Sequence, residues 1–210
     1  MVKSVKQPAK LPDGWEWKKI GDVCDFVKET RDPRKSPDAK FIYIDISSVD
    51  SESKTIREPV IMLGRNAPSR ARKVVRKDDI ILSMTRPNLN AIALISDMYD
   101  NQICSTGFSV LRAKSNVSHD FVFKYMQGKA FIEHISSLVQ GALYPAVTEK
   151  QIYDIALPLP LARDEQVRIA RMLQAALGHS VRARNAARTQ LAEIEALPRI
   201  ILDKAFRGEI

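Results

Sequence analysis

The sequence predicts an α+β domain followed by one long helix. Over the first 160 residues, short segments whose hydrophobicity alternates, as in strands, are mixed with short segments of helical period. After residue 160 a single helical pattern takes over, with few turn-forming residues. Hydrophobic residues make up 45% of the chain, which is enough for a folded core. We therefore expect a globular domain at residues 1–160 and a helical region at residues 161–210.

The elements of the globular domain follow from local patterns. They are expected to be a turn at Leu11–Trp15, a short strand and a brief helix through Ile20–Val27, a charged loop at residues 28–40, strands at Phe41–Ser47, Ile80–Met84, Ala91–Ser96 and Phe108–Arg112, and helices from Phe121 and from Thr148. The first long strand is expected to be half-buried, because Ile42 and Ile44 alternate with Tyr43 and Asp45. Gly128 is expected to break the helical segment, and the four residues from Thr148 fit a capping box.

The helical region is expected to form a rod. From Glu165 to Leu197 no proline interrupts the pattern, and Asp164 is placed to cap the helix. That segment would span about 50 Å at about 1.5 Å per residue. The residues with near-heptad spacing are Leu173, Leu177, Ser180, Ala187, Leu191, Ile194 and Ile201, while Arg184 and Pro198 occupy two further positions of this seam. We expect a homodimer in which the seam meets a second helix; the alternative is a helix that folds back on its own domain.

The charge balance favours an anionic partner. The chain holds 33 Lys and Arg against 25 Asp and Glu, a formal net charge of +8, and the run Arg65–Lys77 has six basic residues and no acid. Nucleic acid or an anionic membrane surface therefore ranks above a neutral partner. No apolar run approaches the roughly 20 residues of a membrane span. The N-terminus lacks a signal-peptide core, and Cys24 and Cys104 sit in apolar segments. We expect reduced thiols, a cytoplasmic location and no membrane.

Motifs that bind cofactors or metals are missing from the sequence. It has no glycine-rich phosphate loop, and its three histidines lack a second ligand at metal-binding spacing. The one enzyme-like pattern is Asp38 followed by Glu52 and Lys54, which resembles the PD…ExK arrangement in which two carboxylates hold magnesium and a lysine polarises water. Glu52 and Lys54 fall in a polar turn, where this chemistry needs a strand. A magnesium-dependent DNA endonuclease is therefore kept as the alternative function.

The basic and amide residues suit the two tasks of DNA recognition, which are phosphate neutralisation and base reading. The residues expected on the DNA-facing surface, mainly against phosphates, are Arg65, Arg70, Arg72, Lys73, Arg76 and Lys77, and Lys35 is a further DNA-binding candidate. Those expected to discriminate bases are Arg86, Asn88 and Asn90, between two strands, with Arg31, Arg34 and Tyr144 from neighbouring loops. Arg pairs with guanine and Asn with adenine in the major groove. The alternative is that Pro87 and the asparagines only form a turn.

Five segments, in order, resemble the specificity subunit of type I restriction–modification systems. They are LPDGWEWKKIGDV, SRARKVVRKDDIILSMTRPNLNAIAL, STGFSVLRAK, GALYPAVTEKQIYDIALPLPLARDEQVRIARML and LDKAFRGEI. The family's subunit has two target-recognition domains that alternate with two helical conserved regions, and each domain reads half of a split DNA site. This sequence departs from that pattern, because it has one domain and one helical region. It is expected to be either a natural half-size subunit or one half of a longer chain.

The resemblance implies a sequence-specific DNA-binding subunit that is not itself catalytic. It implies double-stranded DNA and a modification subunit as partners, with S-adenosylmethionine as the cofactor of that partner, which methylates adenine N6, and no cofactor in this chain. It leaves open a restriction subunit that translocates and cuts DNA. A two-fold pair of chains would recognise a gapped palindrome. A third interpretation is a coiled-coil adaptor whose basic globule only gives solubility.

Overall fold

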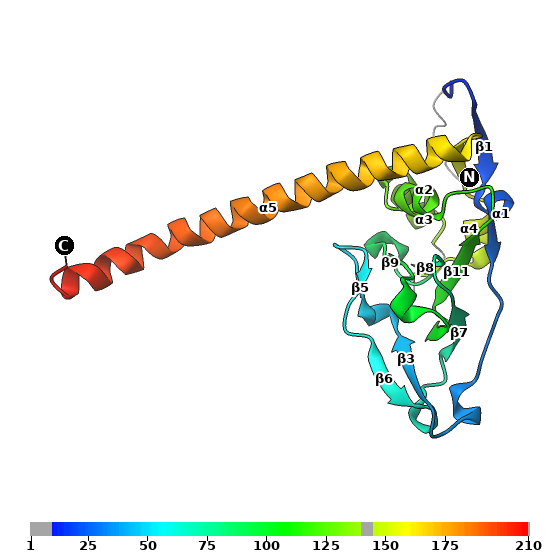
Figure 1. The fold of residues 1–210 in the computed structure, drawn as a ribbon, viewed down its shortest axis with the longest axis horizontal. Coiled ribbons are helices and arrows are strands. Elements are labelled where there is room, and N and C mark those ends of the chain that lie inside the picture. The colour runs from blue at the N-terminus through cyan, green and yellow to red at the C-terminus, as the bar shows by residue number, and fades with distance from the viewer. Residues whose placement is uncertain (1–9, 140–144, 210) are drawn as a thin grey trace. The chain divides into compact units, whose positions relative to one another are not determined.

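The structure is a computed structural model that describes residues 10–139 and 145–209 (Figure 1). The chain divides into two compact units, which meet in sequence between Val167 and Arg168. The α+β class with a long C-terminal helix is confirmed.

The first unit is built from small sheets and short helices. Its strands are β1 (Trp15–Lys19), β2 (Cys24–Phe26), β3 (Lys40–Ile44), β4 (Val49–Asp50), β5 (Thr55–Ile56), β6 (Val60–Leu63), β7 (Ala71–Val75), β8 (Ile80–Ser83), β9 (Ile92–Leu94), β10 (Gln102–Ser105), β11 (Phe108–Ala113) and β12 (Ala156–Pro160). Its α-helices are α1 (Ile20–Val23), α2 (His119–Met126), α3 (Lys129–Ser137) and α4 (Glu149–Tyr153). Its 3-10 helices are η1 (Pro33–Lys35), η2 (Ile46–Ser48), η3 (Gly64–Asn66), η4 (Pro87–Leu89) and η5 (Asp97–Tyr99).

Two four-stranded sheets form the centre of this unit. Their strand orders are β6-β3-β10-β7 and β2-β11-β8-β9, while β1 pairs with β12 and β4 with β5. Among the pairs of described strands, β3 and β10 run parallel and the others antiparallel. One buried cluster contains Ile44 and Cys104 from the first sheet and Ile81 and Val110 from the second. The two sheets therefore pack face to face around a shared core.

The C-terminal end of strand β3 is buried on both faces, where the alternation predicts one buried face. Ile44 belongs to the core between the sheets, as the alternation predicts. Tyr43, on the opposite face, is only 5% exposed, because it packs in a second cluster with Ala67 and Ile103. Ala67 comes from the segment before β7. That segment covers this face of β3 through a tertiary contact, which the alternation of residues within β3 cannot predict.

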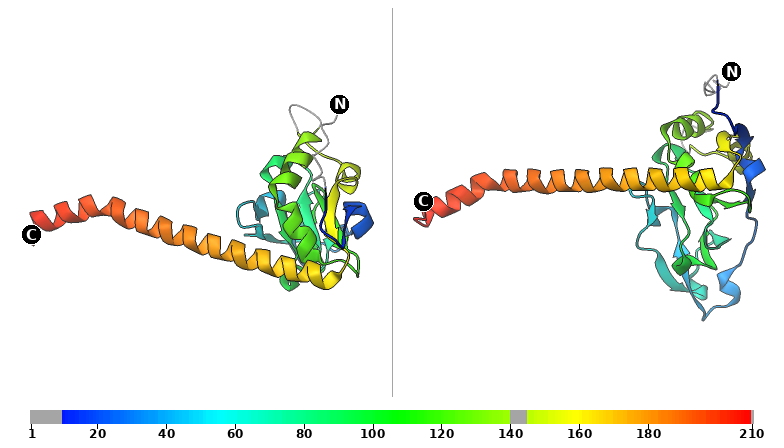
Figure 2. Two further views of the ribbon diagram at one scale, coloured as in Figure 1. Left: turned by 90° about the horizontal axis from the view of Figure 1, so that it is seen from above. Right: turned by 45° about the horizontal axis from the view of Figure 1, so that its top comes forward.

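Helix α2 lies against β11 and β9 of the sheet β2-β11-β8-β9, and α3 lies beside α2 and η4 (Figures 1 and 2). The side chains on the outer face of that sheet, Ile80, Leu82, Ile92 and Leu111, are at most 1% exposed. Gly128 is the N-cap of α3, which confirms the expected break. The capping box at Thr148 is also confirmed, since its side chain accepts the Gln151 N–H and Gln151 reaches back to the Thr148 backbone.

Several expected boundaries change. The predicted helix through Ile20–Val27 ends at Val23, because Cys24–Phe26 pairs with β11 as β2. The three strands expected at Ile80–Met84, Ala91–Ser96 and Phe108–Arg112 are confirmed as β8, β9 and β11, within a few residues at each end. Strands β6 and β10 were not expected from local patterns.

Helix α5 (Arg163–Phe206) has 44 residues, about 66 Å at about 1.5 Å per residue. It begins one residue before Asp164, so Asp164 lies in the first turn and not at the cap. Negative charge there still favours the positive end of the helix dipole. The helix continues through Pro198, where the sequence pattern had suggested an end near Leu197. Figure 2 shows a bend in its red, C-terminal turns, as expected for a proline inside a helix.

Candidate nucleic-acid interface

The basic run Arg65–Lys77 lies on β7 and the segments that flank it. Five of its six basic side chains form ion pairs: Arg65 with Asp38 (2.8 Å), Arg72 with Asp32 (3.4 Å), Lys73 with Glu149 (2.6 Å), Arg76 with Glu29 (2.9 Å) and Lys77 with Asp97 (2.8 Å). The acidic partners come from loops and helices distant in sequence. Much of the run's charge is therefore matched inside the chain, where the sequence pattern predicts a DNA-facing surface for all six basic residues.

Lys73 points into the unit. Its Nζ donates to the carbonyl oxygen of Phe108 at 2.7 Å and to Glu149 Oε1 at 2.6 Å. The side chain is 15% exposed. A phosphate contact by Lys73 would break both bonds and expose a lysine that the fold has largely removed from water. The predicted phosphate role of Lys73 is therefore wrong.

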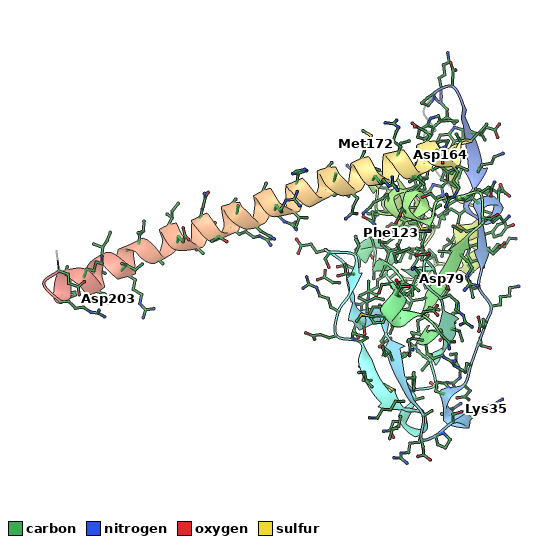
Figure 3. All side chains as sticks on the ribbon, viewed as in Figure 1. Lys35, Asp79, Phe123, Asp164, Met172 and Asp203 are labelled. Carbon is green, nitrogen blue, oxygen red and sulfur yellow. The ribbon has the colours of Figure 1, made fainter. Side chains whose placement is uncertain are left out.

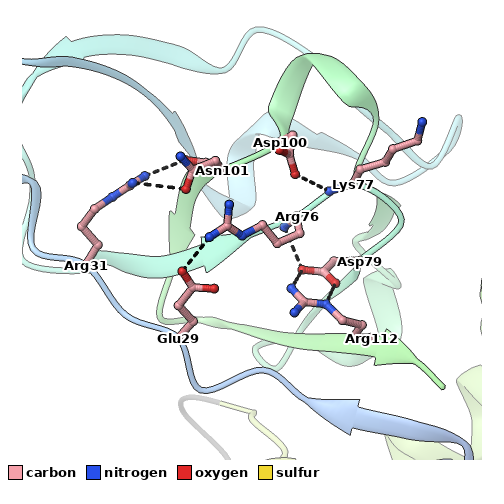
Figure 4. Close-up of polar contacts among 8 residues, drawn as sticks. All are labelled: Glu29, Arg31, Arg76, Lys77, Asp79, Asp100, Asn101 and Arg112. Carbon is pink, nitrogen blue, oxygen red and sulfur yellow. Dashed lines mark hydrogen bonds and ion pairs between the residues drawn. The ribbon is translucent and has the colours of Figure 1, made fainter. Parts of the chain in front are cut away.

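The turn between β7 and β8 is organised by Asp79, which is fully buried (Figure 4). Its carboxylate accepts hydrogen bonds from Arg112 Nε at 2.7 Å, Arg112 Nη2 at 2.8 Å and the backbone N–H of Arg76 at 2.8 Å. The hydrogen bonds to Asp79 raise the pKa of the Arg112 guanidinium. Arg76 then reaches Glu29, and the Lys77 N–H donates to Asp100. Arg76 and Lys77 are thus parts of a structural network.

Most of the other predicted DNA-facing cations gather at one end of the unit. We call this end the basic tip and define it as residues 31–40 and 64–72. Backbone hydrogen bonds join its two segments, from Arg31 N to Arg72 O (2.9 Å), from Gly64 N to Ala39 O (2.9 Å) and from Arg65 N to Pro37 O (3.0 Å). A Cβ on Gly64 would lie 2.2 Å from the carbonyl oxygen of Pro33, so η3 approaches η1 this closely only with glycine. Sequence reasoning missed Gly64, whose role depends on that distant contact.

The basic tip holds seven basic and two acidic residues, a net charge of +5. Arg34 binds Asp32 through Nε (3.0 Å) and Nη2 (2.9 Å), and this pairing lowers the pKa of the Asp32 carboxyl to about 2. The Arg31 guanidinium is held by Asn101, through its carbonyl (2.6 Å) and its Oδ1 (3.2 Å). Among the ion pairs of the described residues, none involves the exposed side chains of Lys35, Lys40 and Arg70. The tip is a surface suited to phosphate, and it adds Lys40 to the expected set.

The second candidate surface is the connection between β8 and β9. We call it the β8–β9 loop (Met84–Ala91). Arg86 and Asn88 are exposed in it, as expected for groups that reach base edges. Arg86 has a left-handed backbone, with φ 47° and ψ 55°, and its N–H donates to the Pro145 carbonyl at 2.8 Å. The loop is therefore an ordered structure in which the expected turn and the two candidate readers coexist.

Asn90 does not fit the role predicted for it. It is 3% exposed, and its Nδ2 donates to the Met126 carbonyl at the end of α2 (3.3 Å). A side chain with that burial cannot present its amide to an adenine in a groove. The prediction that Asn90 reads bases is corrected on this ground.

The two candidate surfaces lie apart within the first unit. Figure 3 shows Lys35, in the basic tip, at one end of the unit and Phe123, in α2, towards the other. The β8–β9 loop belongs to the α2–α3 end, since η4 contacts α3. Arg31 and Arg34 are therefore not neighbours of Arg86 and cannot contact the same base as Arg86. Tyr144, the other predicted neighbour, lies outside the described residues.

The nuclease alternative receives no support from the geometry. Asp38 precedes β3 and pairs with Arg65, whereas Glu52 follows β4, and β3 alone spans about 16 Å at about 3.3 Å per residue. Lys54 Nζ donates to the Asn90 carbonyl at 2.7 Å instead of facing a carboxylate pair. Among the described residues, no group of three or more His, Cys, Asp or Glu side chains is arranged to bind a metal ion. Cys24 and Cys104 are free and buried, and burial raises the pKa of both thiols to about 12.

The second unit presents an apolar seam along α5. The predicted seam residues that are large, Leu173, Leu177, Leu191, Ile194 and Ile201, are between 43% and 61% exposed, and Ala187 is exposed as well. Five arginines and no acid fall between residues 166 and 192, including Arg184 in the seam. No helix in the described ranges is both long and apolar enough to cross a membrane.

The fold and its charged surfaces define a basic α+β binding module with a helical extension. The chain belongs to the family of type I restriction modification DNA specificity domains, whose family model matches residues 12–191. This membership confirms the resemblance carried by the five sequence segments.

The relatives agree with this assignment. The chain is 23% identical to the type I restriction enzyme EcoDI specificity subunit of Escherichia coli over 205 residues, which are 98% of this chain and 44% of that subunit. It is similar to the HsdS subunit of Thermoanaerobacter tengcongensis, with 42% identity, a TM-score of 0.78, and coverage of 85% of this chain and 46% of that one. A chain from a structure of a type I R-M system gives 38% identity, a TM-score of 0.84, and coverage of 90% and 49%. The chain spans about half the length of these relatives.

Proposed function

We propose that this chain is a non-catalytic, DNA-reading part of a type I restriction–modification specificity subunit, and that it recognises one half of a bipartite site. The observation that carries the proposal is the match of the DNA specificity family over residues 12–191, together with identity near 40% to an HsdS subunit and to a chain from a structure of a type I R-M system, across most of this chain. The basic tip supplies affinity for phosphate, and Arg86 and Asn88 on the β8–β9 loop discriminate bases.

The complete reader contains two such modules. The exposed apolar seam of α5 supports this step, because large apolar side chains at heptad spacing are stabilised by a second helix. The second module is another copy of this chain or the other half of a longer one. Two copies related by a two-fold axis read a gapped palindrome.

The catalytic partner is a modification subunit that binds S-adenosylmethionine and methylates adenine N6. The chain itself then needs no cofactor. A restriction subunit that cleaves DNA is a further partner of the same complex. The acid-free stretch of α5 is a candidate surface for either DNA or an acidic face of these subunits.

The decisive experiment is co-expression of the chain with its modification partner, followed by mapping of methylated adenines in genomic DNA. We expect methylation at one bipartite motif with a fixed gap. Purified protein should bind an oligonucleotide with that motif more tightly than shuffled DNA. The absence of any motif, together with sequence-indifferent affinity at every salt concentration, would contradict the proposal.

Two substitutions separate the surfaces. Arg70→Ala, at the basic tip, should weaken binding to all sequences and reduce the slope of log K against log salt by about 1. Arg86→Ala should cost about 1–3 kcal/mol of discrimination at one base pair. Lys73→Met serves as the control. The wild-type Lys73 side chain points into the unit, so its replacement should leave the slope of log K against log salt unchanged. Equal effects of Arg70→Ala and Arg86→Ala across a site library would refute the division.

The helix seam is tested by Leu191→Lys in the full chain. A charge in the seam should shift the protein from dimer to monomer in sedimentation, because a lysine cannot be buried there without a partner. Thr189→Lys, two residues away and exposed on the other side of the helix, is the matched control and should leave the dimer intact. A monomeric wild-type chain at micromolar concentration would remove the basis of the homodimer.

A further inference from the structure

The β8–β9 loop is attached to the rest of the first unit at three separate places. The first is residues 145–147, which pair with it through Arg86 N to Pro145 O (2.8 Å) and Val147 N to Met84 O (2.9 Å). The second is the end of α2, where the Met126 carbonyl accepts from Asn90 Nδ2 at 3.3 Å. The third is the turn between β4 and β5, where Lys54 Nζ donates to the Asn90 carbonyl at 2.7 Å. Two of the three attachments therefore converge on Asn90.

Asn90 has the properties of a fixed anchor. It is 3% exposed and adopts a left-handed backbone with φ 47° and ψ 51°, a conformation that asparagine tolerates better than most residues. Its own N–H donates to the Pro87 carbonyl at 3.0 Å, which closes the 3-10 turn that carries Asn88. The orientation of that turn thus depends on where Asn90 is held.

Lys54 reaches Asn90 from a turn that is itself ordered. Asp50 Oδ1 accepts the N–H groups of Glu52 (2.8 Å) and Ser53 (2.9 Å), and the Lys54 N–H donates to the Asp50 carbonyl at 2.9 Å. Burial lowers the pKa of the Lys54 amine. The side chain is part-buried where a solvated lysine would be exposed, and its ammonium group donates to a backbone carbonyl.

We propose that Lys54 and Asn90 are positioning residues, which hold the β8–β9 loop in one conformation so that its exposed residues meet DNA in a fixed geometry. The inference rests on the proposed function, since it assigns these two residues to base discrimination by Arg86 and Asn88. Neither Lys54 nor Asn90 touches DNA. A loop that moves would spread its readers over many orientations and lose the directional hydrogen bonds on which base reading depends.

The first test is a measurement on the free protein. Lys54→Met keeps the length and burial of the side chain and removes its hydrogen bonds; Asn90→Gly keeps the left-handed backbone and removes the amide. Hydrogen exchange of peptides covering residues 84–91 should be about tenfold faster in both variants, with the rest of the unit unchanged. Lys129→Met, whose lysine side chain is 88% exposed, is the control and should exchange like wild type. Unchanged exchange in both variants overturns the proposal, whatever the protein binds.

The second test separates positioning from direct contact. In the full chain with its modification partner, Lys54→Met should reduce the preference for the cognate site over single-base variants by about fivefold or more, the lower limit for losing one good base contact. The slope of log K against log salt should not change. If the slope falls by about 1 and the preference is kept, Lys54 is a phosphate ligand and the proposal is wrong. If wild-type protein shows no site preference, the proposed function fails instead, and hydrogen exchange still decides whether the loop is anchored. Melting temperatures of all variants identify any that have lost the fold, and the remaining variant then carries the test.

Discussion

Replacing Asp79 with alanine tests whether the basic run is held in place by buried pairing. The Asp79 carboxylate is fully buried and accepts three hydrogen bonds, two from Arg112 and one from the Arg76 backbone, all between 2.7 and 2.8 Å. Removing one member of a buried ion pair costs about 3–5 kcal/mol when the remaining charge stays buried. The Arg112 side chain is 43% exposed and regains water, so we expect the lower end, about 3 kcal/mol of unfolding free energy.

The assay is urea unfolding of the full chain, with Asp38→Ala as the matched control. Asp38 also pairs with an arginine at 2.8 Å, but its side chain is 81% exposed, and such pairs contribute about 0–1 kcal/mol. A loss of about 3 kcal/mol corresponds to a melting temperature lower by about 6–12 °C for a chain of this size. The reasoning is refuted if Asp79→Ala costs less than about 1 kcal/mol, or if Asp38→Ala costs as much as Asp79→Ala.

Two further predictions concern the basic tip. Gly64→Ala puts a methyl group 2.2 Å from the Pro33 carbonyl oxygen, so it should lower the unfolding free energy by about 1–3 kcal/mol; Gly178→Ala, whose nearest neighbour is 3.5 Å away in α5, should be neutral or stabilising in the same urea titration. Arg34→Ala should raise the pKa of the Asp32 carboxyl from about 2 towards its ordinary value of 3.8, as followed by NMR titration. Because the pKa is lowered in the folded state, this carboxylate stabilises the fold above pH 3.8, and the contribution is lost as the pH falls through about 2. An unchanged titration midpoint in the variant would show that Arg34 is not the cause.

Local patterns predicted the elements whose stabilising contacts are themselves local or periodic. The capping box at Thr148 and the break at Gly128 depend on neighbouring backbone, and both are confirmed. Strands β8 and β11 are apolar runs bounded by turn residues, so their positions follow from composition. Pro198 within α5 was the exception, because a proline in a sequence pattern usually predicts the end of a helix. A helix of 44 residues tolerates the one backbone hydrogen bond that this proline removes.

The site was predicted less well, because its residues are defined by partners from elsewhere in the chain. Arg86 and Asn88 are exposed on a loop between strands, as their residue types indicate. Lys73 and Asn90 have equally suitable types, yet Lys73 is largely enclosed and Asn90 is buried, each by contacts with residues more than 30 positions away. Sequence spacing carries no signal for such contacts. Lys54 differs in another way. The sequence pattern places it in a nuclease-like motif, whereas in the structure its amine donates to the Asn90 carbonyl of the β8–β9 loop.

Two segments of the chain hold more positive charge than their own acidic residues can neutralise. The basic tip carries +5, and the five arginines of residues 166–192 carry another +5, so the remainder of a chain with net charge +8 sums to −2. Attraction to a polyanion depends on the excess charge within a Debye length, about 8 Å at physiological salt. A matched pair such as Lys77 and Asp97 adds little at that range, whereas the basic tip keeps an excess of +5 after its two acidic residues are counted. The density of basic residues along the sequence is therefore a weaker guide to phosphate contacts than the absence of nearby acids in the fold. By that criterion Arg70 and Lys35 are better candidates than Arg76 and Lys77, although the latter two lie in the same basic run as Arg70.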